Sequence, residues 1–179
     1  MPSVVGHTIA GVSVGYALSP RNRGALYWMA VIALSIIPDI DVIAFRFGIP
    51  YAHPLGHRGF FHSLPFAATA AIMTAMCISW HASIKERMRV CGALSAVALL
   101  HPILDMLTNG GLGIGIFIPF DMRRYFFPWR PIIVSPLSIR SFFEPSGARV
   151  IANECAYIAL PCLAIVIARL LMDMKGSRP

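Results

Sequence analysis

Apolar stretches long enough to cross a lipid bilayer restrict what this chain can fold into more than any other feature. Four of them cover residues 25–45, 63–80, 91–108 and 151–172. At about 1.5 Å per residue, each forms a helix of roughly 27 Å or more, close to the thickness of a hydrocarbon core. A shorter, glycine-containing stretch at residues 4–18 predicts a tilted or partly inserted fifth helix. The sequence therefore predicts an all-α integral membrane bundle of about five helices, forming one domain over residues 1–179.

The composition supports a membrane location and limits the class of partner. Hydrophobic residues make up 57% of the chain and charged residues only 13%, whereas a soluble domain carries about 25% charged residues. The net charge is +7, but the basic residues lie mainly between apolar stretches, where they anchor loops to lipid headgroups. We therefore expect membrane lipids as partners and no nucleic acid. The sequence leaves the oligomeric state open.

The segment between the third and fourth long stretches does not fit a spanning helix. Residues 112–120 are apolar but too short, which predicts a re-entrant or interfacial segment. Residues 121–149 combine arginines with aromatic residues and prolines, which is typical of an amphipathic loop at the interface. Lysine and arginine are frequent in cytoplasmic loops. Many of them lie at Arg21 and Arg23, in the loop at 81–90 and in the C-terminal tail, which predicts that these segments are cytoplasmic and that the polar groups described next lie on the other side. The basic loop at 109–150 opposes that assignment, so the orientation stays open.

Ionisable side chains inside or beside apolar segments are costly, which makes each one a functional candidate. A chain that crosses the bilayer back and forth with short loops brings alternate helix ends to the same face. All the candidates fall at such ends, so the sequence predicts that they converge at one membrane face and line a cavity for metal. They are His7, Asp39, Asp41, His57, His62, His101, Asp105 and Glu154.

The strongest local pattern is a histidine and an aspartate four residues apart. His101 and Asp105 project from one face of a helix at that spacing, so both can reach one metal ion or bridge two. Asp39 and Asp41 follow Pro38, which suits a frayed helix end. One of the two aspartates can bind metal while the other supports a histidine, or both can cap the helix end.

The two histidines that precede the apolar stretch at residues 63–80 are not helix partners. His57 and His62 are five residues apart, which does not keep them on one helix face. A turn that leads into a helix start would aim both inward, with Ser63 capping that helix and Pro65 in its first turn.

Some of these residues also have simpler interpretations. A histidine in a membrane helix more often makes a hydrogen bond between helices, which applies to His7. His101 and Asp105 also fit a buried ion pair, and Glu154 fits an isolated carboxylate at the interface. The convergence of the whole set, rather than any one residue, favours a metal site.

Imidazole and carboxylate ligands together suit zinc, with manganese and iron as alternatives. A metal with an open coordination position activates water for attack on a phosphoryl or acyl centre. Asp41 and Glu154 are the candidate general bases, and Arg58 is placed to hold an anionic oxygen of the substrate. We expect one or two divalent ions, with these predicted ligands: His7, Asp39, His57, His62, His101 and Asp105.

Four motifs carry a resemblance to a known family. The segments PDID, GHRGFFHS, HPILDMLTNGG and PFDMRRYFFPWRPI resemble the YdjM-like family of bacterial inner-membrane metal-dependent hydrolases, over most of the chain. This resemblance implies an inner-membrane location and a metal-dependent hydrolysis whose substrate the family does not define. A more distant similarity is to zinc-dependent phospholipase C and related nucleases, through the order His, Asp, His and then His-x-x-x-Asp. That similarity implies a bridging role for Asp105.

The predicted function is therefore a membrane-bound metal-dependent hydrolase, with a phosphoester that resembles a lipid headgroup as its small substrate. The alternative from another class is a non-hydrolytic membrane carrier that uses the His/Asp cluster for haem, a metal ion or protons. A carrier should have acidic or histidine residues along the full depth of the bundle. In this sequence they gather towards one end.

Overall fold

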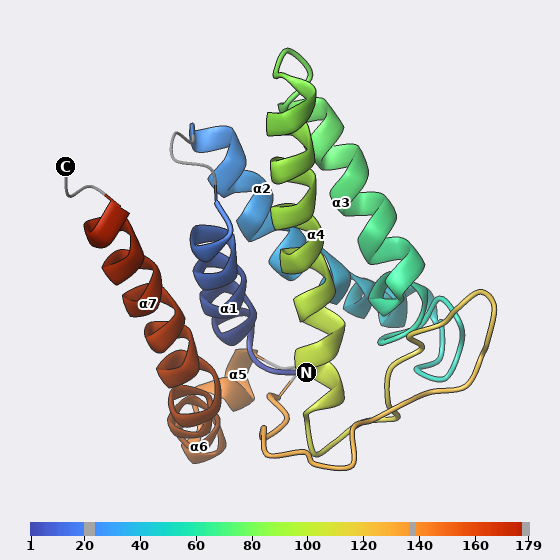
Figure 1. The fold of residues 1–179 in the computed structure, drawn as a ribbon. Coiled ribbons are helices and arrows are strands. Elements are labelled where there is room, and N and C mark those ends of the chain that lie inside the picture. Colours follow the sequence, from blue (N-terminus) through green and yellow to red (C-terminus); the bar gives the residue numbers. More distant parts are fainter. Residues whose placement is uncertain (20–23, 137–138, 177–179) are drawn as a thin grey trace.

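The computed structural model describes residues 1–19, 24–136 and 139–176, and its regular elements are helices. The predicted all-α bundle of about five helices is confirmed (Figure 1). Arg21 and Arg23, on which part of the orientation prediction rests, lie outside the described residues. The main helices are α1 (Val4–Ala17), α2 (Ala25–Ile36), α3 (Leu64–Ile78), α4 (Ile84–Met106), α6 (Pro145–Glu154) and α7 (Leu160–Gly176).

Short helical segments extend or connect these helices. The 3₁₀ helix η1 (Ile37–Phe47) continues α2, η2 (Phe60–His62) precedes α3, and α5 (Ile139–Phe142) precedes α6. The π-helical turn η3 (Cys155–Ala159) joins α6 to α7. The last helix therefore begins at Pro145 instead of residue 151, because proline fits the first turn of a helix, where no N–H partner is needed.

Three helical stretches are long and apolar enough to cross a membrane: Ala25–Phe47, Ile84–Met106 and Pro145–Lys175. Of the other two helices, α1 has the short length expected for residues 4–18, whereas α3 is shorter than the spanning stretch predicted at residues 63–80. Helix α1 has 14 residues and α3 has 15, so each is only about 21–22 Å long at the α-helical rise. They are therefore apolar helices of the bundle that do not by themselves match a hydrocarbon core of about 30 Å.

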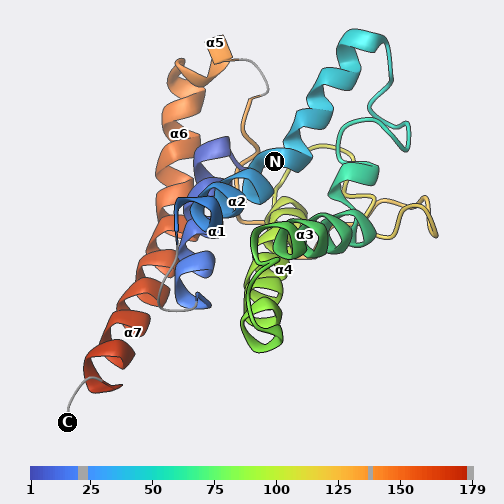
Figure 2. The same cartoon turned by 90° about the horizontal axis from the view of Figure 1, so that it is seen from above.

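Helix α4 occupies the centre of the bundle and contacts α1, α2 and α3. Seen from above, α3 and α4 lie side by side, and the α6–α7 helix lies on the far side of α1 (Figure 2). The alanines Ala67, Ala71 and Ala75 of α3 are buried in the main apolar cluster. Such small side chains let helices approach closely, which is typical of packing in membranes.

The contact between α1 and α2 depends on glycine. A Cβ atom on Gly11 would lie 1.8 Å from Oγ of Ser35, and one on Gly15 would lie 3.0 Å from the side chain of Val31. No other residue fits at Gly11 without displacing Ser35. This close approach brings α2 to the position from which the Ser35 carbonyl contacts the site described below.

Serine caps fix where the helices begin at the site face. Ser3 accepts a hydrogen bond from the N–H of Gly6 at the start of α1, and Ser63 accepts one from Phe66 at the start of α3. The cap predicted at Ser63 is therefore present, with Pro65 in the first turn. In Figure 1 the start of α3, the end of α4 and α6 all lie towards the lower end of the bundle.

The chain after α4 folds into an irregular layer across this lower end. Ile114 pairs with Tyr125 in an isolated antiparallel bridge. Arg124 donates hydrogen bonds to the carbonyls of Tyr51 and His57. Residues 112–120 thus form turns instead of a membrane-crossing helix, as their length predicted, and they tie this layer to the segment before α3.

Candidate metal centre

Four segments of the chain bring the predicted site residues together. His7 comes from the second turn of α1, while Asp39 and Asp41 come from η1. The other contributors are the segment before α3 and the last two turns of α4. Every one of these seven side chains is buried, with at most 8% of its surface exposed. They are His7, Asp39, Asp41, His57, His62, His101 and Asp105.

Five of the seven surround a common point. Ligand atoms of His7, Asp39, His101 and Asp105 all lie within 4.8 Å of one another. The Nε2 atom of His62 lies 3.4 Å from Oδ1 of Asp39 and 3.4 Å from Oδ2 of Asp105. Nε2 of His101 is 3.4 Å from the same Oδ1 of Asp39, and Nε2 of His7 is 3.3 Å from Oδ1 of Asp105.

The atoms that face this point make no hydrogen bond within the described part of the chain. They are Nε2 of the three histidines and all four carboxylate oxygens of Asp39 and Asp105. A buried polar atom without a partner is costly, and a cation shared between such atoms would offset that cost. The nitrogen–oxygen separations of 3.3–3.4 Å match the edge of a tetrahedron around an ion with bonds of about 2.1 Å. The residues therefore fit a metal ion.

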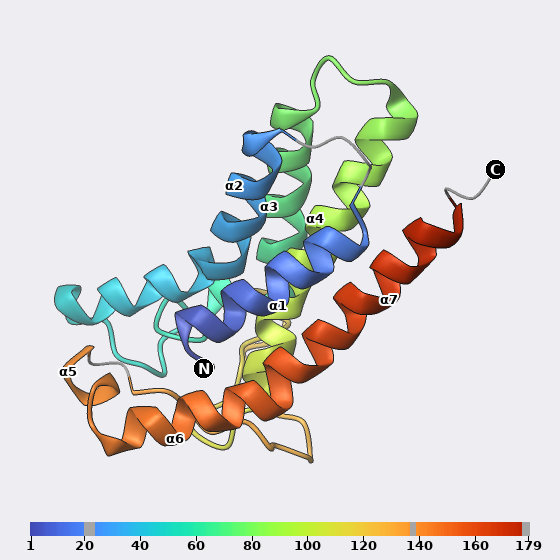
Figure 3. The same ribbon diagram turned by 90° about the vertical axis from the view of Figure 1, so that its left-hand side faces the viewer.

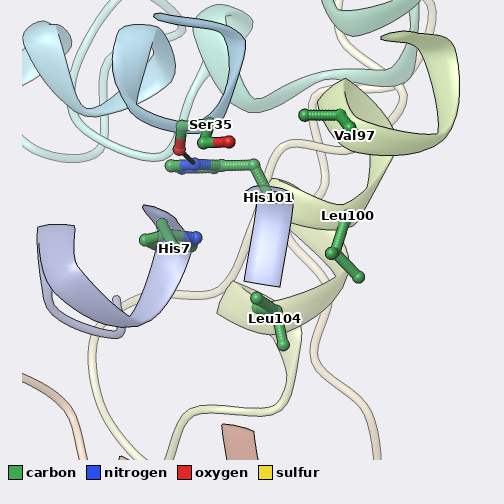
Figure 4. Close-up of a pocket in the computed structure, with 7 residues that line it drawn as sticks. His7, Ser35, Val97, Leu100, His101 and Leu104 are labelled. Carbon is green, nitrogen blue, oxygen red and sulfur yellow. Dashed lines mark hydrogen bonds between the residues drawn. The ribbon is translucent and has the colours of Figure 1, made fainter. Parts of the chain in front are cut away.

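The opposite sides of two histidine rings are held by acceptors. Nδ1 of His101 lies 2.7 Å from the carbonyl oxygen of Ser35. Because a carbonyl can only accept, Nδ1 carries the proton, and Nε2 presents its lone pair to the cluster. The ring of His7 stacks on that of His101, with centroids 3.8 Å apart (Figure 4). The narrow pocket beside these two rings is lined by apolar residues of α1 and α4 and by Ser35.

Asp41 contacts two histidines from the rim of the cluster. Its Oδ1 lies 2.6 Å from Nδ1 of His57, and its Oδ2 accepts a hydrogen bond from the backbone N–H of Arg58. Oδ2 also lies 3.0 Å from Nδ1 of His62, close in distance but outside hydrogen-bond alignment. His57 forms a second candidate group with Asp39 and His62, but its Nδ1 is already engaged by Asp41.

Arg58 is fully buried and directed at the protein's own groups. Its guanidinium donates to the carbonyl of Gly110 at 2.6 Å and to Oγ1 of Thr108 at 2.8 Å, and Nε lies 3.4 Å from Oδ2 of Asp105. A Cβ on Gly111 would lie 2.5 Å from Nη1, so the chain must be glycine there. The structure places the guanidinium of Arg58 beside Asp105, and the contact with an anionic substrate expected from the sequence stays a prediction.

Glu154 lies apart from the groups that could hold a metal ion. Its carboxylate accepts hydrogen bonds from the backbone N–H and the hydroxyl of Ser3, and it packs against Gly6. It joins α6 to the start of α1 and is in neither of the His/Asp groups that could hold an ion.

The cluster carries an excess of negative charge. Three carboxylates, those of Asp39, Asp41 and Asp105, face only two cationic groups. These are the guanidinium of Arg58 and the amino group of Met1, which is 3.9 Å from Oδ1 of Asp105. Burial by itself opposes a charge on His62, but the neighbouring carboxylates raise the pKa of its ring well above the ordinary value. A divalent cation would offset the same carboxylates without a proton on histidine.

Comparison with known proteins identifies the family. Residues 1–176 match the family described as YdjM inner membrane protein. The chain belongs to this family. It is also 33% identical over 171 residues to the inner membrane protein YbcI of Escherichia coli (strain K12), a match that covers 93% of this chain and 95% of the relative. No solved structure matches it.

These matches confirm two of the predictions. The family and the relative are both named as inner membrane proteins, and the fold has three helices that can span a membrane. The chain is therefore an inner membrane protein with buried His/Asp groups that could hold a metal ion. The similarity to zinc-dependent phospholipase C stays a prediction.

Proposed function

We propose that this protein is a membrane-embedded metal-dependent hydrolase that acts on a phosphoester at the membrane surface. One observation carries the proposal: three imidazole nitrogens and two carboxylates from four segments face one buried point and have no hydrogen-bond partner there among the described residues. A protein gains nothing in stability from burying such atoms unpaired. Their purpose is therefore to bind an ion.

The donor set favours zinc. Neutral imidazole and carboxylate oxygen are both common zinc ligands, with bonds of about 2.0–2.2 Å. We assign His7, Asp39, His62, His101 and Asp105 as the ligands of one ion or of two ions that share the aspartates. Manganese or iron fits the same donors with more ligands per ion, so elemental analysis decides between them.

The chemistry that the ion supplies when bound is Lewis acidity, which lowers the pKa of a coordinated water from 15.7 to about 7. The protein's own residues set the positions of the donors. The Ser35 carbonyl fixes the tautomer of His101, the Asp41 carboxylate lies 3.0 Å from Nδ1 of His62, and Nε of Arg58 lies 3.4 Å from Asp105. We assign Asp41 this positioning role instead of that of general base, because both of its oxygens contact other groups.

Two features favour hydrolysis over transport. The ligand-bearing residues lie at helix ends on the site face, where a headgroup phosphoester would be. Among the described residues, the buried histidines and acidic groups all belong to the cluster or to the Ser3–Glu154 contact beside it. A carrier of ions or protons needs such groups along the depth of the bundle, and the buried polar side chains towards the other end include Ser13 and Ser79.

Elemental analysis of detergent-purified protein tests the metal site. We expect at least one divalent ion per chain, lost in His62→Ala and retained in His81→Ala, which removes an exposed histidine between α3 and α4. Hydrolysis of bis-p-nitrophenyl phosphate should then require the metal, stop on chelation and fail in His62→Ala. Purified wild type that contains no metal and takes none up would overturn the proposal. Metal without chelator-sensitive hydrolysis would refute the enzyme and leave the metal site.

A further inference from the structure

An apolar groove runs between α1 and the α6–η3 segment, on the side of α1 away from α4. The volume within it is about 140 Å³. Val5 and Ile9 of α1 form one wall, and Ile151, Ile158 and Ala159 form the other. Figure 3 shows α6 and α7 passing alongside α1, which is where the groove lies.

The lining of the groove contains one polar contact. Ser3, just before α1, and Glu154, at the end of α6, hydrogen-bond to each other there. The remaining lining is almost entirely apolar. A carboxylate whose oxygens are already taken up by Ser3 joins the two walls of the groove.

The π-helical turn η3 coincides with the groove. Cys155, Ile158 and Ala159 belong to this turn and also line the groove. A π turn inserts an extra residue into a helix, which displaces the wall locally and is frequent at functional sites. The groove is therefore built by an irregularity of the chain rather than by loose packing between regular helices.

The polar contact in the groove lies close to the candidate metal centre. The amino group of Met1 is 3.9 Å from Oδ1 of Asp105, and Ser3, two residues further along the chain, lines the groove. Two residues span at most about 7 Å, so the two sites are within roughly 11 Å of each other. His7 points to the cluster from the same helix that supplies Val5 and Ile9 to the groove.

We infer that the groove binds one acyl chain of a membrane lipid, with the headgroup directed to the site face. The occupant follows from the surroundings: the protein is embedded in the inner membrane, the groove is apolar and open, and what surrounds it there is lipid. The orientation follows from the Ser3–Glu154 contact, which marks the side of the groove nearest Asp105, because an acyl chain enters apolar surface and its headgroup does not. Binding of the chain stands on the groove alone. The further step, that the substrate is this phosphoester lipid, rests on the proposed function.

Photolabelling tests the binding site. The purified protein is reconstituted into phosphatidylethanolamine vesicles that contain a trace of the same lipid with a diazirine on its acyl chain, and the labelled residues are mapped by mass spectrometry. We expect labelling at Val5, Ile9 and Ile151 to exceed that at Leu163 and Leu170 of α7 several-fold. Equal labelling of both regions would mean that ordinary bilayer contact explains the result, and would overturn the proposal.

Filling the groove supplies the matched test. Ala159→Phe should reduce groove labelling several-fold and leave metal content unchanged, whereas Ala164→Phe, on an exposed part of α7, should change neither. Ile151→Trp provides a second filling variant should Ala159→Phe fold poorly. Unchanged labelling in a folded filling variant would contradict the inference.

An activity comparison separates this inference from the proposed function. Ala159→Phe should lower kcat/KM for the long-chain phospholipid and leave hydrolysis of bis-p-nitrophenyl phosphate unchanged. An equal loss with both substrates would overturn the assignment of lipid as substrate. Groove labelling without hydrolysis of either substrate would instead refute the proposed function while the lipid site stands.

Discussion

Oδ2 of Asp41 lies 3.0 Å from Nδ1 of His62, on the side of the ring opposite the cluster. The same carboxylate binds Nδ1 of His57 at 2.6 Å. A carboxylate behind a histidine fixes the orientation of the ring and raises its basicity as a ligand. Asp41 is therefore placed to influence how His62 could hold a metal, without facing the cluster itself.

Removing the charge of Asp41 should weaken metal binding without abolishing it. We expect Asp41→Asn to lower zinc affinity about 10–100-fold, the range typical of residues that support metal ligands. Competition with a chromogenic chelator measures the change. Glu144→Gln, at an exposed acidic residue before α6, is the control. A loss as complete as that in His62→Ala would show that Asp41 is itself a ligand.

Removing the metal should destabilise the protein. A free metal concentration of about 100 times the dissociation constant stabilises the folded state by about 2.7 kcal/mol. For a chain of this size, that corresponds to a rise in Tm of about 5–10 °C. Thermal unfolding in detergent, with and without chelator, measures it. The His101→Ala variant should show no further decrease on chelation. Identical wild-type curves in both conditions would argue against a metal bound by the folded state.

The buried arginine should be essential for stability. Arg58→Ala leaves Asp105 without its guanidinium neighbour and frees acceptors on Thr108 and Gly110. Breaking a buried charged contact of this kind costs about 3–5 kcal/mol. Arg89→Ala, at an exposed residue that pairs with Glu86, should change the free energy of unfolding by less than about 1 kcal/mol. A change in the free energy of unfolding that is equally small in both variants would show that the contacts of Arg58 do not stabilise the fold.

A pair of glycine substitutions tests the approach of α1 to α2. Gly11→Ala places a methyl group 1.8 Å from Oγ of Ser35, so it should destabilise the fold by about 1–3 kcal/mol. It should also weaken metal binding, because the Ser35 carbonyl holds His101. Gly92→Ala meets nothing within 4 Å and should be neutral or slightly stabilising, since alanine favours a helix over glycine. Similar stability and metal content in the two variants would contradict this account.

Hydropathy and alternation alone predicted that the chain is an all-α membrane bundle and that its polar residues gather at one end. Both predictions succeed because spanning length and the cost of burying ionisable groups are set locally by the residues themselves. The same reasoning placed the serine cap and the proline at the start of α3.

The contacts that turn this gathering into a site depend on tertiary structure. Three contacts join residues that are far apart in the chain: the Ser35 carbonyl with His101, Arg58 with Asp105, and Ser3 with Glu154. The last of these holds Glu154 away from the cluster. A backbone carbonyl has no signature in the sequence, and the direction of a long side chain is decided by which partners the packed helices bring within reach. The sequence thus determined which residues could bind a metal and at which end of the bundle. Only the packing of α1 against α2 and α4 decided which atoms face the centre of the cluster and which groups contact them from behind.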